Sequence, residues 1–268
     1  MSEVIQTIVQ GLQASVKQSP YVWCAAVLTF LIGAQLALAV SIAHGDEETV
    51  RRQLNNLHQI DYIPHNTTDE KKSRDSITQD SKEELVQRLS MITPVASCAA
   101  IKVDLEQYPE AQTYDSSYFL AVDSGKTDEK GFVIWTSMSQ QTKPVLSKVK
   151  TELWLPRSNA DENDPLVQSG GCIIMSFPDP ITPTWMRYFV GFTGNRLKTP
   201  QAACILPLQP TTADIHDHKI KTRPLSIDGE VGKGLNMEGL PAVSDVLPKL
   251  KVFVSQPERQ KITIFRRS

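Results

Sequence analysis

The residues best suited to chemistry lie together in the segment Asp214-Ile215-His216-Asp217-His218. In an extended chain alternate side chains point to the same side, so Asp214, His216 and His218 would share one side. Two imidazoles and a carboxylate are ligands that Zn²⁺ accepts, and a bound zinc ion can activate water for hydrolysis. A zinc site needs three or four ligands, and the sequence shows no further set elsewhere. We therefore interpret the segment as a polar loop between strands, with a metal site as the alternative.

The four cysteines are Cys24, Cys98, Cys172 and Cys204. None of them forms a Cys-x-x-Cys pattern, which excludes a zinc ribbon or a redox motif of that type. In an oxidising compartment two of the last three could pair. Cys172–Cys204 is the preferred disulfide, because both residues lie in predicted strands. The alternative is three buried thiols that behave as small hydrophobic side chains.

Two further patterns carry no chemistry. Ser147-Lys148-Val149-Lys150 fits Ser-x-x-Lys, but the companion motifs of serine acyl-enzymes are absent. Residues 229–234, GEVGKG, lack the spacing of a phosphate-binding loop and the Ser or Thr after its Lys, so we interpret them as a flexible turn. The sequence thus predicts no catalytic residue, no cofactor and no enzyme activity.

Composition limits the class of protein. The chain has 268 residues, with 28 Lys and Arg against 30 Asp and Glu, so no overall basic surface favours nucleic acid as a partner. Aromatic residues make up 7% and charged residues 22%, which excludes a wholly disordered chain. The mean hydropathy of -0.24 excludes a polytopic membrane protein.

One segment departs from this average, because residues 21–43 contain no charged side chain. At about 1.5 Å per residue, a helix of this length spans the hydrocarbon core of a bilayer. We predict an uncleaved signal-anchor, and a signal peptide cleaved near residue 43 is the alternative. Small side chains spaced by four would form one ridge on which two helices could pair. These residues are Ala25, Thr29, Gly33, Ala37 and Ser41.

The segments on either side of this helix differ in composition. Residues 1–20 have apolar positions at helical spacing and predict a cytoplasmic amphipathic helix. Val50, Leu54 and Leu57 continue a helical stripe, so residues 44–60 are expected to form a helical stalk. Residues 61–82 are polar and rich in both charges, which is typical of a flexible linker.

Residues 83–268 are predicted to form a mainly β extracytosolic domain, a β-sandwich or a partly open barrel, with a short leading helix. The capping-box pattern at residues 81–84 begins that helix, and Pro94 ends it. No long amphipathic helix is expected after Pro94, which disfavours a doubly wound α/β fold. The expected strands cover residues 118–122, 132–137, 145–155, 172–177, 185–192, 203–208, 219–225, 250–254 and 262–265.

This layout is similar to that of single-pass inner-membrane components of bacterial secretion, conjugation or pilus machines, although no motif places the chain in a family. It implies a structural or assembly protein that acts through protein–protein contacts, with its N-terminus in the cytoplasm and its domain in the periplasm. Expected partners are the lipid bilayer, other subunits and a second copy through the membrane helix. The alternatives are a membrane-anchored metal-dependent hydrolase that uses His216 and His218, and a receptor-like or viral surface module.

Overall fold

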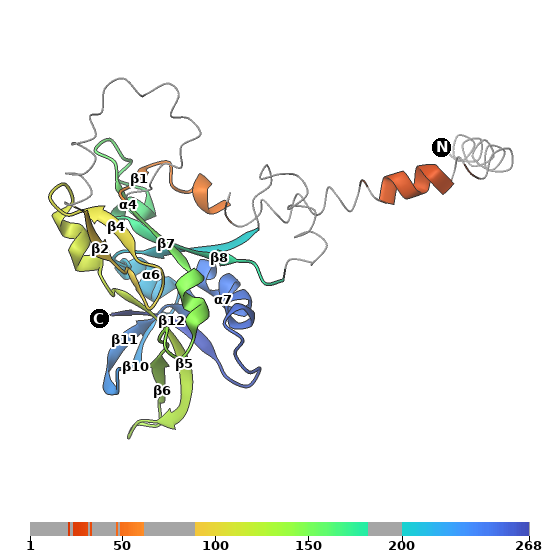
Figure 1. Cartoon of the computed structure of the whole chain (residues 1–268). Helices are drawn as coiled ribbons and strands as arrows, with labels where there is room; N and C mark the ends of the chain where they lie inside the picture. Colours follow the sequence, from red (N-terminus) through yellow and green to blue (C-terminus); the bar gives the residue numbers. More distant parts are fainter. Residues whose placement is uncertain are drawn as a thin grey trace. The chain divides into compact units, whose positions relative to one another are not determined.

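The computed structural model describes residues 21, 24–31, 33, 47, 49–61, 89–181 and 200–267 (Figure 1). The chain divides into two compact units, residues 1–45 and 46–268. In the first unit the described residues are helical. No helix among the described residues combines the length and the apolar character needed to cross a membrane. The helix predicted for residues 1–20, the linker after Asp61 and the strand predicted for residues 185–192 lie outside the described residues.

The second unit is mainly β, as the sequence predicts, and one part of it is a closed five-stranded barrel. The ring order is β5-β6-β10-β11-β12, and β12 pairs with β5 to close it. All neighbours are antiparallel except β6 and β10, and the short β3 adds beside β5 in parallel. The bounds are β3 Val95–Ala96, β5 Tyr118–Thr127, β6 Val133–Ser137, β10 Lys221–Ile227, β11 Glu230–Asn236 and β12 Ile262–Arg267.

A small apolar cluster fills the inner face of this barrel, as expected for a barrel of few strands. Its buried members are Phe119, Ala121, Trp135, Leu225 and Phe265. A Cβ atom on Gly234 would lie 3.0 Å from Phe265 and 3.2 Å from the carbonyl oxygen of Arg266. The GEVGKG segment is therefore a strand with a close backbone approach, and its prediction as a flexible turn is wrong beyond Gly229. The turn itself is Asp228-Gly229, with φ of 51° and 92°, as a two-residue hairpin requires.

The second part is an antiparallel four-stranded sheet in the order β1-β7-β8-β9. Alternate side chains of its strands face the main core, which they share with the outer face of the barrel. The other side chains form a second cluster on the opposite face of the sheet. The bounds are β1 Leu57–Gln59, β7 Lys150–Pro156, β8 Cys172–Pro178 and β9 Gln201–Pro207. A separate pair is formed by β2 Leu89–Ile92 and β4 Ile101–Asp104.

The helical elements are short except for α7, Pro241–Phe253, which packs its buried side chains at 3.6-residue spacing on the main core. The prediction that no long amphipathic helix follows Pro94 is therefore wrong. Residues 250–253 belong to α7 rather than to a strand. The others are η1 Pro109–Tyr114, η2 Pro144–Lys148, α4 Pro165–Gln168, α6 Thr212–Asp217 and η3 Met237–Gly239. Residues 145–148, expected to be strand, thus lie in a 3-10 turn.

Two predictions for the entry to the domain are also corrected. The helical stalk predicted for residues 44–60 is helical in the described residues 47 and 49–52, but Leu57 begins β1, which pairs with β7. Val50, Leu54 and Leu57 are all buried in the second cluster, so this segment is part of the domain. The leading helix predicted to continue up to Pro94 is wrong over Leu89–Ile92, which form β2. The capping-box residues themselves lie outside the described part.

Candidate protein-interaction site

The outer edge of β9, the last strand of the four-stranded sheet, is the candidate site. Leu208 N–H donates to the carbonyl of Gly171, and Asp179 N–H donates to the carbonyl of Pro200. Along an antiparallel pair of strands, residues that hydrogen-bond to the partner strand alternate with residues whose backbone groups point away from it. The even-numbered residues of β9 therefore bond to β8, and the backbone groups of the odd-numbered residues point away from it.

At one end of this edge the outward groups are already used. Pro207 has no N–H to donate, which suits an outward position on an edge strand. Its carbonyl accepts a hydrogen bond from the hydroxyl of Tyr118. Within the described part of the chain, the N–H and C=O groups of Ala203 and Ile205 have no such partner. The open stretch of the edge is therefore Ala203–Ile205.

This open stretch forms one side of a pocket of about 420 Å³. Five residues of α7 form one wall of the pocket: Pro241, Ala242, Asp245, Val246 and Lys249. The opposite wall is the segment that contains Thr49, Val50 and Gln53. Because α7 packs on the main core and Val50 packs on the second cluster, one wall stands on each face of the sheet.

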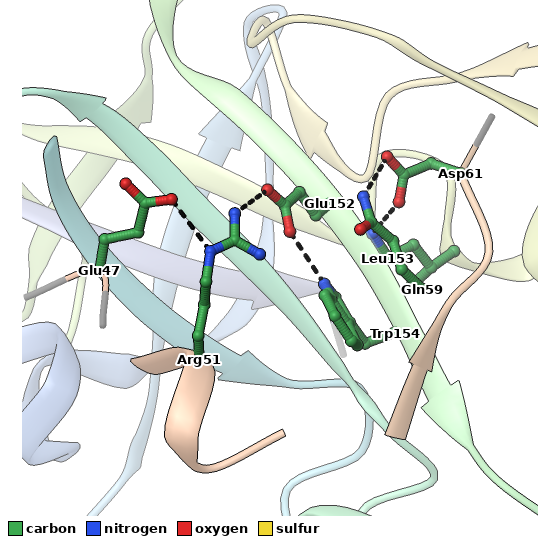
Figure 2. A network of polar contacts seen from close by, with 7 residues as sticks. All are labelled: Glu47, Arg51, Gln59, Asp61, Glu152, Leu153 and Trp154. Carbon is green, nitrogen blue, oxygen red and sulfur yellow. Dashed lines mark hydrogen bonds and ion pairs between the residues drawn. The ribbon is translucent and has the colours of Figure 1, made fainter. Parts of the chain in front are cut away.

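An ionic network fastens the second wall to β7 (Figure 2). The Nη2 atom of Arg51 donates to Glu152 at 3.1 Å, and its Nε atom donates to Glu47 at 3.0 Å. The indole N–H of Trp154 donates to the other carboxylate oxygen of Glu152 at 3.0 Å. Burial lowers the pKa of Arg51, but the two carboxylates outweigh it and raise this pKa above its ordinary value. The network holds the wall beside the sheet.

Asp61 fixes the same segment at its other end, where β1 leaves the sheet (Figure 2). Its carboxylate accepts from the side chain of Gln59 at 2.8 Å and from the N–H of Leu153 at 3.3 Å. Burial raises the pKa of Asp61 above its ordinary value, against the effect of these two hydrogen bonds, and the charge of Glu152 also raises it. The carboxyl group is therefore easier to protonate than an exposed one.

The charges that line the pocket are unequal. Lys249 Nζ lies 3.2 Å from Asp179 Oδ2, so its charge is compensated inside the domain. Asp245 is exposed on the same helix and makes no ion pair with any described residue. The pocket thus presents one uncompensated carboxylate beside an open strand edge.

The metal candidates are placed differently from the expected extended chain. Residues 212–217 form α6, because Thr211 and Asp214 make a capping box in which each side chain bonds the backbone of the other. His216 lies in the last turn of α6 and His218 caps the end of that helix, so the two are not in the extended chain that would point both imidazoles to one side. The His216 side chain is 89% exposed and contacts Asp217. No group of three or more possible metal ligands occurs among the described residues.

Cys172 and Cys204, the pair expected to form a disulfide, lie on neighbouring strands with free thiols. Cys172 faces the second cluster and Cys204 faces the main core, so the two side chains are on opposite faces of the sheet. Burial raises the pKa of each of these thiols, and that of Cys98, to about 12. At neutral pH all three are therefore protonated and poorly nucleophilic.

The small residues predicted to form a helix-packing ridge are described only in part. Ala25, Thr29 and Gly33 are helical and exposed. The hydroxyl of Thr29 donates to the carbonyl of Ala25 at 2.8 Å, so it is satisfied within its own helix. Ala37 and Ser41 lie outside the described residues.

Two features of the sequence are signals for this pocket. The stripe of Val50, Leu54 and Leu57 predicts a stalk when it is taken as a continuation of the preceding helix, but its apolar side chains equally suit burial against a sheet. Pro207, at the end of a predicted strand, has no N–H to donate, which favours an edge position. No known family model, curated protein or solved structure matches this chain.

Proposed function

We propose that the protein is a single-pass, membrane-anchored structural component of a multiprotein envelope assembly and acts through protein–protein contacts. The observation that carries this proposal is the open edge of β9 in a pocket with a wall on each side. Proteins use such edges to bind extended segments of other proteins, because the backbone hydrogen bonds supply affinity. The contacts of the β-rich domain, rather than a reaction, are its contribution.

The anchor in this proposal is the charge-free segment of residues 21–43. A helix over these residues has the length to span a bilayer, with the N-terminus in the cytoplasm and residues 46–268 in the periplasm or another extracytosolic space. Self-association through the ridge that includes Ala25, Thr29 and Gly33 would bring several domains together, since small side chains allow helices to approach closely.

Extraction of native membranes with alkaline carbonate tests the anchor. We expect the full chain to stay in the pellet with residues 1–20 intact. A chain in the supernatant, or a mature product that begins after residue 43, would remove the anchor from the proposal.

Blue-native electrophoresis of detergent-solubilised membranes tests the assembly. We expect the protein to migrate in a complex with other subunits, well above the size of the bare chain. Migration as the bare chain under conditions that preserve other membrane complexes would contradict the proposed function.

A further inference from the structure

We infer that the pocket beside β9 binds an extended, positively charged segment of a partner protein, which adds as a strand to the open edge of β9. This inference rests on the proposed function in one respect, because the partner is another subunit of the assembly.

The backbone of β9 determines that the occupant is extended. The outward N–H and C=O groups of Ala203 and Ile205 lie two residues apart, as they do along any strand edge. Ile205 as a whole is only 7% exposed and Ala203 is half-buried, so these groups lie in a partly dehydrated position where unmade hydrogen bonds are costly. A strand that runs beside β9 supplies a donor and an acceptor at the same spacing, whereas a helix keeps its backbone groups bonded internally.

The open edge sets the length of the occupant. It spans Ala203–Ile205, and beyond it the hydroxyl of Tyr118 already donates to the carbonyl of Pro207. At a rise of about 3.4 Å per residue, about three residues of a bound strand run beside this stretch.

The charge of the pocket selects a basic segment. Lys249 is paired with Asp179, while the Asp245 carboxylate makes no ion pair within the described residues. A Lys or Arg on the side of the bound strand that faces α7 would compensate Asp245, and an acidic residue there would be repelled. Charges of this kind contribute more to the choice of partner than to affinity.

A second copy of this chain fits the pocket less well than a single extended segment. Each copy carries its own α7 and its own segment 49–53 beside β9. Bringing two β9 edges together would place these walls against each other and bring two Asp245 side chains into one space. A single extended segment brings neither this steric conflict nor a second Asp245 side chain.

The test uses the full chain in detergent and two short peptides of alternating Val and Thr, one with a central Lys and one with a central Glu. Residue-resolved amide exchange is measured with increasing peptide. We expect the Lys peptide to slow exchange at Ala203 and Ile205 at least tenfold, with little change at Ala202 and Cys204, which already bond to β8. The same Lys peptide with every backbone nitrogen methylated should give no protection, because it has no N–H to donate.

Charge variants test the role of Asp245. Asp245→Asn should weaken binding of the Lys peptide roughly twofold to fivefold, as expected for an exposed ion pair. Asp245→Lys should reverse the preference so that the Glu peptide binds better. Ser244→Lys is the matched control, since Ser244 is exposed on the same helix but does not line the pocket, and it should keep the preference for Lys. If Asp245→Lys does not fold, Asp245→Asn carries the test.

Three results would overturn the inference. The first is unchanged exchange at Ala203 and Ile205 at saturating peptide, and the second is equal protection by the methylated peptide. The third is protection that rises with protein concentration in the absence of peptide, which would assign the edge to a second copy. None of these depends on carbonate extraction, so the inference and the anchor can fail separately.

Discussion

Among the described residues, Asp61 is a carboxyl group whose surroundings raise its pKa above the ordinary value, with burial as the largest cause. Because burial raises its pKa, the folded chain binds this proton more tightly than the unfolded chain does. Its favourable contribution to stability is complete below the ordinary Asp pKa and is lost as the pH rises through the raised value. The contribution of Asp61 to the free energy of unfolding therefore decreases as the pH rises from acid to neutral.

We predict that Asp61→Asn removes this loss. Asn retains an oxygen that can accept from Leu153 N–H and cannot ionise. The free energy of unfolding of Asp61→Asn minus that of wild type should therefore increase as the pH rises from about 4 to 7. Urea denaturation at several pH values measures this difference. Glu230→Gln, an exposed change on β11, is the control. A constant difference between Asp61→Asn and wild type across this range would contradict the role given to burial.

The three domain cysteines allow a second prediction at the residue scale. Because burial keeps Cys98, Cys172 and Cys204 protonated, N-ethylmaleimide should leave them unmodified in the folded Cys24→Ala protein and modify all three in urea. Intact-mass measurement distinguishes the two states. A native mass lower by two hydrogens, with a peptide that links Cys172 to Cys204, would instead support the disulfide expected from the sequence.

At the scale of the elements, the entry segment can be tested as part of the core. Leu57 in β1 is fully buried, so Leu57→Ala should lower the free energy of unfolding by about 2–5 kcal/mol. Met91 in β2 is 68% exposed, and Met91→Ala should change it by less than about 0.5 kcal/mol. Denaturant titrations measure both changes. If Leu57→Ala had as small an effect as Met91→Ala, residues 44–60 would be a stalk outside the domain.

The glycines of β11 make a matched pair for the barrel. A Cβ atom at position 234 would press on Phe265, whereas at position 232 its nearest contact is the carbonyl oxygen of Leu225 at 3.9 Å. We expect Gly234→Ala to cost about 1–3 kcal/mol by overpacking and Gly232→Ala to be close to neutral. Thermal unfolding of both variants measures the difference. A neutral Gly234→Ala would show that Phe265 can move aside.

The elements also show which parts of the fold are predictable from the sequence. Strands such as β5, β8, β9 and β12 can be identified because they are apolar runs of sufficient length. The three-residue β1 and the six-residue α6 are too short to establish a period, and the prolines of α7 obscure its helical spacing. The candidate site is only partly predictable: Pro207 favours an edge, but the open stretch of β9 depends on which strand lacks a neighbour among the described strands of the folded sheet.

At the scale of the whole molecule, the described core lies within residues 46–268. Its first buried members, Val50, Leu54 and Leu57, lie well before residue 83, where the sequence predicts the start of the domain. A fragment of residues 46–268 keeps this core, the ionic network of Arg51 and both walls of the pocket. A fragment of residues 83–268 loses β1, the Val50 wall and the covering of one face of the sheet.

We predict that the 46–268 fragment unfolds in one cooperative transition at the urea midpoint of the full chain and leaves the carbonate pellet. The 83–268 fragment should unfold at a clearly lower midpoint or aggregate, because Ile174 and Ile205 lose their apolar cover. Circular dichroism, sedimentation and extraction of the two fragments measure these outcomes. Equal stability of both would place the domain boundary after the linker, and a 46–268 fragment that stays in the pellet would show that the domain itself holds the protein at the membrane.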